Sequence, residues 1–296
     1  MQLEKLKSIT GHAAAIYDVT SKDELFAYTT SADKYVARWD LKRGVQDNFA
    51  VKLEFSGFRI ALNHNNQTLA IGNSKGGIHF IDLEKKVEKR LLTQHKSAIF
   101  SLNYDEINNV FYSGDAEGYF CVWNGDSFDL LLTLPFNCGK IRQISINENA
   151  SHIAICGQDG NVRIIETHFY NEIATLKAHR LGANCAVFDH DRLYTGGKDA
   201  HIIMWDWKSN SKLKSIPAHN YAVYDLALFN GDENLVSVSF DKSIKLWKTD
   251  GLSIVERVEF KDGGHRHVVN RISKLDDRSF LTVSDDKQII QWKIID

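Results

Sequence analysis

The twelve histidines have the widest chemical range of any residues in this sequence, because an imidazole can ligate a metal or transfer a proton near neutral pH. Two of them flank one arginine at His265-Arg266-His267, a spacing that could begin a metal site. No cysteine or carboxylate stands at the spacing of a zinc site, however. We therefore predict that the chain holds no metal.

Other residues that could support catalysis also lack the surroundings that the chemistry needs. Asp285-Asp286 pairs two carboxylates, as general acid–base catalysis requires, but Asp286 falls in a predicted turn. The glycine pairs Gly76-Gly77 and Gly196-Gly197 lack the helix of a phosphate-binding loop, and no GxSxG motif occurs. The sequence thus predicts no catalytic residue and no cofactor, and we expect that the chain is not an enzyme.

Charge and composition narrow the classes of partner. The formal net charge is −2, so no excess of positive charge is available for nucleic acid. No segment approaches the roughly 20 apolar residues of a membrane span, and the first twelve residues are too polar for a secretion signal. We expect a cytoplasmic monomer that binds neither nucleic acid nor membranes. Its four cysteines lack CxxC spacing and are interpreted as reduced core thiols: Cys121, Cys138, Cys156 and Cys185.

The elements that position these side chains repeat along the chain. Five tryptophans end similar phrases, such as DKYVARW and DKSIKLW, with gaps of 84, 82, 42 and 45 residues between them. Two further units should then end near residues 81 and 165, where KGGIHFI and DGNVRII stand. Seven units fill residues 1–296 as one domain. The third strands of the units are expected to end near residues 39, 81, 123, 165, 205, 247 and 292.

Each unit is typical of short antiparallel strands. In LVSVSFDKSIKLW, residues 235–247, two alternating segments flank a turn at Phe240-Asp241-Lys242. No helical period is sustained anywhere. Four strands in each unit of about 42 residues predict an all-β fold, a seven-bladed β-propeller of four-stranded antiparallel blades.

With these phrases the sequence resembles the WD-repeat family over essentially its whole length. The resemblance implies a buried tetrad in a blade: a His before the first strand, a Ser or Thr on the second, an Asp in the following turn and the Trp of the third. Five units match, with Glu117 in place of Asp in the third: His12, Thr29, Asp33 and Trp39; His95, Ser113, Glu117 and Trp123; His179, Thr195, Asp199 and Trp205; His219, Ser237, Asp241 and Trp247; His265, Thr282, Asp286 and Trp292.

Units two and four depart from this pattern consistently. Isoleucine replaces the hydroxyl residue at Ile71 and Ile155, and the Trp at Ile81 and Ile165. A half-satisfied buried polar network is worse than an apolar core, so loss of the whole network is expected. Asp159 alone survives in unit four.

The pentapeptide KLKSI indicates how the ring closes. It occurs at residues 212–216, as an outer strand, and again at residues 5–9. The chain ends at Asp296, four residues after Trp292, so the last unit lacks an outer strand of its own. We predict that residues 5–9 complete the last blade and remove two exposed sheet edges.

The resemblance implies a partner site on the top face, where the loops before the first strand and after the second emerge. The residues expected there, around the central channel, are Tyr17, Phe58, Phe100, Arg142, Asn184, Lys198, Tyr224, Phe240 and Asn270. Small residues at Ala32, Ser74 and Ala116 should leave the first three rings uncovered. These rings either plug the channel or bind a segment with an apolar anchor, flanked by Asp or Glu or carrying a cation stacked between the rings. Beneath them, Asp18, Arg59, Asp225 and Arg271 are expected to line the channel and hold water.

We therefore predict a non-catalytic protein-interaction scaffold that binds a peptide or protein segment on its top face. The alternative is a small-ligand-binding or enzymatic propeller that uses the channel mouth. A deep polar pocket would favour the alternative, and a shallow aromatic bowl favours the scaffold.

Overall fold

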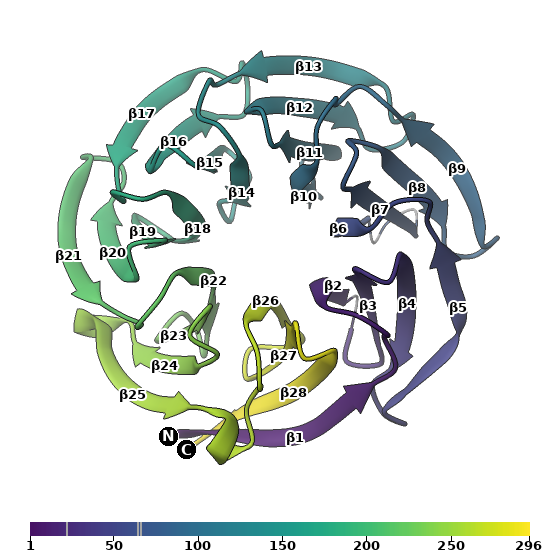
Figure 1. The fold of residues 1–296 in the computed structure, drawn as a ribbon. Coiled ribbons are helices and arrows are strands. Elements are labelled where there is room, and N and C mark those ends of the chain that lie inside the picture. Colours follow the sequence, from purple (N-terminus) through teal and green to yellow (C-terminus); the bar gives the residue numbers. More distant parts are fainter. Residues whose placement is uncertain (22, 64, 66) are drawn as a thin grey trace.

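The computed structural model describes residues 1–21, 23–63, 65 and 67–296. Strands in this part of the chain form seven four-stranded antiparallel sheets, arranged as blades around a central axis (Figure 1). Two short 3-10 helices, η1 (Asp250–Leu252) and η2 (Phe260–Asp262), are the helical segments of the described residues. The predicted seven-bladed propeller is confirmed.

Each blade is a meander whose strands follow one another outward from the axis. The first, innermost strands are β2 (Ile16–Ser21), β6 (Gly57–Asn63), β10 (Ile99–Asp105), β14 (Ile141–Ile146), β18 (Ala183–Asp189), β22 (Val223–Phe229) and β26 (Val269–Lys274). The second strands are β3 (Phe26–Ser31), β7 (Thr68–Asn73), β11 (Val110–Asp115), β15 (His152–Gly157), β19 (Arg192–Gly197), β23 (Asn234–Ser239) and β27 (Ser279–Ser284).

The third strands carry the repeated Trp or Ile near their ends: β4 (Tyr35–Asp40), β8 (Ile78–Asp82), β12 (Tyr119–Asn124), β16 (Asn161–Glu166), β20 (His201–Asp206), β24 (Ile244–Lys248) and β28 (Gln288–Ile295). The outer strands are β5 (Val45–Lys52), β9 (Val87–Leu92), β13 (Leu130–Pro135), β17 (Glu172–Lys177), β21 (Ser211–Pro217), β25 (Ser253–Val258) and β1 (Gln2–Thr10).

The ring is closed by β1, as predicted. This strand pairs antiparallel with β28, from Gln2 opposite Ile295 to Thr10 opposite Gln288, with one irregularity between Lys5 and Lys7. The two chain ends therefore lie side by side at the rim of the last blade (Figure 1). The pairing satisfies the edge of β28 that would otherwise be open to another strand.

The hydrophobic core lies between neighbouring blades. One cluster, for example, joins Ile16 and Trp39 of the first blade to Leu281 and Ile289 of the last. Glycines on the second strands permit this close packing, because a Cβ on Gly72 would lie 2.5 Å from the Ile99 side chain of the next blade. The blades thus form a rigid ring, which fixes the loops at both ends of the channel.

Candidate functional site

The histidines that precede the innermost strands belong to buried networks. In the first blade, His12 Nδ1 lies 2.8 Å from Asp33 Oδ2 and its Nε2 lies 2.7 Å from Thr29 Oγ1. The Trp39 indole donates to the same hydroxyl at 2.6 Å. The same connections join His179, Thr195, Asp199 and Trp205; His219, Ser237, Asp241 and Trp247; and His265, Thr282, Asp286 and Trp292.

Both ring nitrogens of these histidines are therefore engaged within the core. For His265, Nδ1 lies 3.0 Å from Asp286 and Nε2 lies 2.9 Å from Thr282. The ring has no lone pair left for a metal, so the His265-Arg266-His267 sequence does not present two imidazole ligands. These networks satisfy buried polar groups and join the strands of the blades that contain them.

The third blade corrects one prediction, because the tetrad carboxylate is Asp115 and not Glu117. His95 Nδ1 lies 2.9 Å from Asp115 Oδ2, and its Nε2 lies 2.7 Å from Ser113 Oγ, which also accepts from Trp123. Glu117 only donates its backbone N–H to Asp115. Asp115 ends β11 two residues after the hydroxyl, so its short side chain reaches both His95 and the turn amides.

The pKa values of His95 and Asp115 are shifted in the directions that keep both groups charged. Burial favours the neutral imidazole, but the hydrogen bonds and charges of Asp115 and Cys121 together outweigh it and raise the pKa of His95 to about 9. Although burial acts in the opposite direction, the hydrogen bond from His95 lowers the pKa of Asp115. The two groups are thus an ion pair at neutral pH, with 1% of each side chain exposed.

The second and fourth blades replace the network by packing. Ile71, Ile81, Ile155 and Ile165 are all buried. Asp159, which the pattern leaves without a histidine, forms an ion pair with Arg163 at 2.7 Å instead.

The predicted top-face residues surround the mouth of the central channel. A cavity of about 250 Å³ is lined by Tyr17, Phe58, Arg59, Phe100, Arg142, Asn184, Tyr224, Asn270 and Arg271. Every innermost strand contributes at least one of them, because each blade directs its first strand toward the axis (Figure 1). The two other predicted residues, Lys198 and Phe240, do not line this cavity and lie in turns after second strands.

Three rings form an aromatic arc, defined as Tyr17, Phe58 and Phe100. Tyr17 and Phe58 pack edge to face with centroids 5.2 Å apart, and Phe58 and Phe100 lie 5.6 Å apart. Each ring is half-buried, so part of its surface still faces the cavity. Across the mouth, Tyr224 packs against the exposed Phe240 with centroids 6.0 Å apart.

A cationic edge, defined as Lys140, Arg142 and Lys198, adjoins one end of this arc. Lys140 Nζ lies 4.7 Å and Arg142 Cζ lies 5.4 Å from the centroid of Phe100. Burial, followed by the charges of Arg142 and Lys140, lowers the pKa of Lys198. Sequence reasoning missed Lys140, which lies in the loop between β13 and β14, two residues before Arg142. The position repeats, because its carbonyl accepts from Gln158 as that of Ala15 accepts from Ala32, but only in this blade is it a lysine beside Phe100.

Two predicted site residues use their amides to join blades. Asn184 donates to the carbonyl of Val223, and Asn270 donates to the carbonyl of Ile16 at 2.7 Å. Asn270 also donates to Asp285 Oδ1. Their remaining surface contributes to the wall of the cavity, but these side chains primarily fix the spacing of neighbouring blades.

A charge belt is defined as Asp18, Arg59, Asp225 and Arg271. Arg59 and Arg271 line the cavity at the mouth, and all four residues line a second cavity of about 300 Å³. Arg271 lies 3.7 Å from Asp18 and 3.3 Å from Asp225, and Asp18 accepts the backbone N–H of Ile60 in the next blade. Arg59 donates to the carbonyls of Tyr17, Phe58 and Phe100. Burial raises the pKa of Asp18. These charges are paired, so they join blades and do not present a free nucleophile or base to the cavity.

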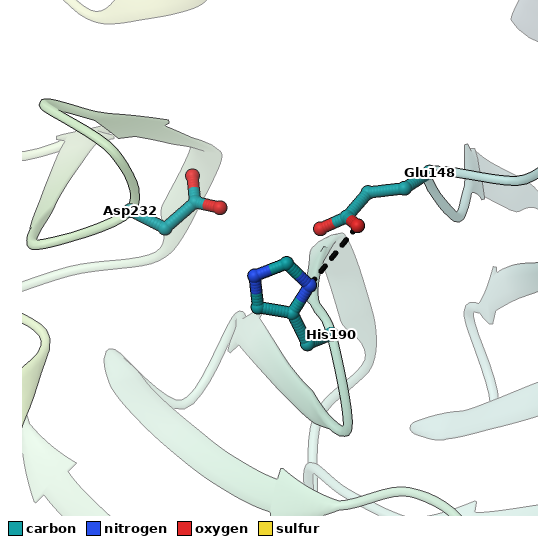
Figure 2. Close-up of side chains that lie close together, drawn as sticks. All are labelled: Glu148, His190 and Asp232. Atoms are coloured by element: carbon teal, nitrogen blue, oxygen red, sulfur yellow. Dashed lines mark ion pairs between the residues drawn. The ribbon is translucent and has the colours of Figure 1, made fainter.

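At the opposite end of the channel, three loops between first and second strands bring Glu148, His190 and Asp232 together (Figure 2). His190 Nδ1 lies 3.0 Å from Glu148 Oε2, and one ligand atom from each residue lies within 4.8 Å of the others. Their side chains point toward one another from separate loops, as Figure 2 shows. The side chains of His190 and Glu148 are 71% and 55% exposed, so water competes strongly with the hydrogen bond between them.

The cysteines and helices add no further candidate. All four cysteines are described, buried and free. None of the helices in the described residues has the length and hydrophobicity needed to span a membrane.

Comparisons with known proteins agree with the repeat pattern. The family model "WD domain, G-beta repeat" matches residues 3–40, 170–206 and 210–248. Each match runs from an outer strand through three strands of the next blade, from β1 to β4, from β17 to β20 and from β21 to β24. The repeat in sequence is therefore staggered by one strand from the blade in space, which is why β1 has to close the ring.

Curated proteins of several organisms are similar to this chain. WD repeat-containing protein 55 of Arabidopsis thaliana is 24% identical over 75% of this chain and 64% of its own length. The p21-activated protein kinase-interacting protein 1-like of Danio rerio is 24% identical over 66% of this chain and 64% of its own. The guanine nucleotide-binding protein subunit beta of Dictyostelium discoideum is 25% identical over 54% of this chain and 45% of its own.

The chain thus spans less than two thirds of the length of each of these relatives. With the matched repeats, these relatives and the bladed ring formed by the described residues, the chain is a β-propeller that contains WD repeats.

Proposed function

We propose that this protein is a non-catalytic scaffold that binds a peptide or protein segment on its top face, around the mouth of the channel. The observation that carries the proposal is the aromatic arc. Tyr17, Phe58 and Phe100 support one another by ring contacts, yet all three retain surface toward the cavity. Rigid aromatic rings provide a large contact area at small entropic cost and are enriched in interfaces.

The names of two relatives are consistent with this function. One is called a kinase-interacting protein and another a subunit of a guanine nucleotide-binding protein, so both names describe association with other proteins. We propose the same general role for this chain. We also propose a cytoplasmic setting, supported by four thiols that are free and buried.

The alternative of a small-ligand or enzymatic propeller has weaker support. The cavity of about 250 Å³ at the mouth and the second one of about 300 Å³, which the charge belt lines, are at or below the lower end of the roughly 300–1,000 Å³ typical of ligand pockets. The ionisable groups of the charge belt are paired with one another or with backbone groups. A small site with aromatic walls suits the side chain of a protein segment better than a whole metabolite.

Affinity capture from cell extract tests the proposal. Wild type is compared with the double variant Phe58→Ala, Phe100→Ala and with Phe169→Ala, which removes a ring that is 73% exposed in the loop between β16 and β17, away from the mouth. A captured protein is then purified, and its Kd is measured by calorimetry. We expect the double variant to weaken binding at least about thirtyfold, because truncating a hot-spot residue costs 2 kcal/mol or more.

The Phe169 variant should bind like wild type, and circular dichroism should show that all three proteins are folded. A partner that binds the double variant as tightly as wild type would refute a top-face site. Co-purification of a metabolite that is lost only in the double variant would instead favour the small-ligand alternative.

A further inference from the structure

The cationic edge of Lys140, Arg142 and Lys198 offers three positive charges at one side of the mouth. They come from two segments: Lys140 and Arg142 lie two residues apart at the start of β14, and Lys198 lies in the turn after β19. None forms an ion pair with a carboxylate among the residues that the structure describes. The Nε of Arg142 is buried and has no hydrogen-bond partner within the described chain.

Arg142 and Lys140 are half-buried, and Lys198 is exposed. Burial lowers the pKa of Arg142, and burial together with the two neighbouring cations lowers the pKa of Lys198. The three cations repel one another, so a carboxylate placed among them would be attracted to all three. We propose that the cationic edge is a subsite for the carboxylates of an acidic partner segment, whose apolar anchor lies on the aromatic arc. This inference rests on the proposed function and deepens it.

The structure also decides against a cation from the partner at this end of the arc. Lys140 and Arg142 already lie within 4.7 Å and 5.4 Å of the Phe100 centroid. Aromatic faces attract cations, and two cations of the protein itself already lie beside the ring of Phe100. A partner Lys or Arg stacked there would meet two like charges.

The two sides of the mouth carry opposite charges, which orients a bound segment. Asp285 accepts from Asn270 at 2.8 Å, and its negative charge contributes to the raised pKa values of Tyr17 and Tyr224, for both of which burial is the larger cause. Negative charge is therefore placed near the first and sixth blades, and positive charge near the fourth and fifth. The acidic residues of the segment should point toward Arg142 and Lys198, with the apolar anchor over Tyr17 and Phe58.

Carboxylates fit this edge better than one compact phosphate. Two of the three cations are lysines, which act as separate point charges, and the guanidinium of Arg142 is held beside Phe100 with its Nε buried. This spread of charge matches two or more Asp or Glu side chains along a segment. A single phosphate is best bound by converging, bidentate donors.

A peptide library provides a test that does not depend on knowing the partner. Random phage-displayed peptides are selected on the wild-type protein and counter-selected on the Phe58→Ala, Phe100→Ala variant. The strongest peptide is synthesised with a fluorescent label, and its Kd is measured by anisotropy. We expect selected peptides to place Asp or Glu beside an aromatic or aliphatic residue.

The decisive comparison is between two charge variants. Lys140→Gln, Lys198→Gln should weaken binding at least about tenfold, because a hydrogen bond to a charged group typically contributes enough for that change. The control Lys212→Gln, Lys293→Gln alters net charge equally, but on the outer strand β21 and on β28. It should bind like wild type.

Each other outcome has a distinct meaning. Peptides that need Phe58 and Phe100 but contain no acidic residue, or that bind both charge variants equally, would overturn the carboxylate subsite and leave the scaffold function standing. A phosphoserine peptide that binds ten times more tightly than its glutamate counterpart would assign the edge to phosphate and refute carboxylates. If no selected peptide depends on Phe58 and Phe100, the proposed function itself is wrong.

Discussion

Replacing Ser113 by alanine removes the central atom of the third-blade network. Ser113 Oγ lies 2.7 Å from His95 Nε2 and accepts from the Trp123 indole at 2.8 Å, and the residue is completely buried. The variant keeps the carbon skeleton and deletes only the hydroxyl. Two buried polar groups, an imidazole nitrogen and an indole N–H, then lose their shared partner.

The magnitude follows from these two groups. Leaving one buried polar group unsatisfied costs roughly 1–3 kcal/mol, so we expect a loss of about 2–4 kcal/mol in the free energy of unfolding. Unfolding entropy of about 2.1 cal/mol/K per residue converts a loss of about 3 kcal/mol into a fall in Tm of about 5 °C for a chain of 296 residues. Differential scanning calorimetry measures this shift directly.

The chain contains a matched control for this substitution. Ser97 Oγ is also buried, but it has no hydrogen-bond partner among the described residues. Ser97→Ala deletes the same atom and should change Tm by less than about 2 °C, because no paired group is stranded. Equal shifts for Ser113→Ala and Ser97→Ala would refute the view that the networks contribute to stability beyond filling space.

Two further predictions concern the carboxylates of the networks. Asp115→Ala should lower the free energy of unfolding by about 3–5 kcal/mol, because it leaves the charged His95 buried without its partner. Glu117→Ala should change the same quantity, measured in urea titrations, by less than about 0.5 kcal/mol. If Glu117→Ala proved the more destabilising variant, Glu117 and not Asp115 would be the carboxylate of the network. Despite the opposing effect of burial, the hydrogen bond and charge of His179 lower the pKa of Asp199 to about 2 in the folded protein, against about 3.9 when unfolded. A lowered folded pKa stabilises the protein above the unfolded value and is lost as pH falls through the folded one. The Tm difference between wild type and Asp199→Asn should therefore be largest above about pH 5 and shrink between about pH 4 and pH 2; a difference that does not change with pH would contradict this pairing.

The periodic features of the molecule could be predicted from the sequence. The spacing of Trp39, Trp123, Trp205 and Trp247 locates the third strands, because every blade must bury an equivalent side chain against its neighbour. The duplicate KLKSI segments predict that residues 5–9 close the ring, since an outer strand needs the same partner wherever it stands in the chain. The aromatic residues of the innermost strands could be assigned to the channel mouth for the same reason.

Contacts that differ from blade to blade became visible only in the tertiary structure. Asp115 rather than Glu117 meets His95 because the outcome depends on the reach of a side chain from one particular turn, which spacing alone does not describe. Lys140 joins Arg142 beside Phe100 because the third and fourth blades are neighbours in the ring, so that residues before and on β14 lie against a ring carried by β10. Residues as far apart as Glu148 and Asp232 meet because three blades lie next to one another in the ring (Figure 2). The strands and turns of each blade follow from a local sequence pattern. Contacts between side chains of different blades depend on how the blades are arranged in the closed ring, which the local pattern does not describe.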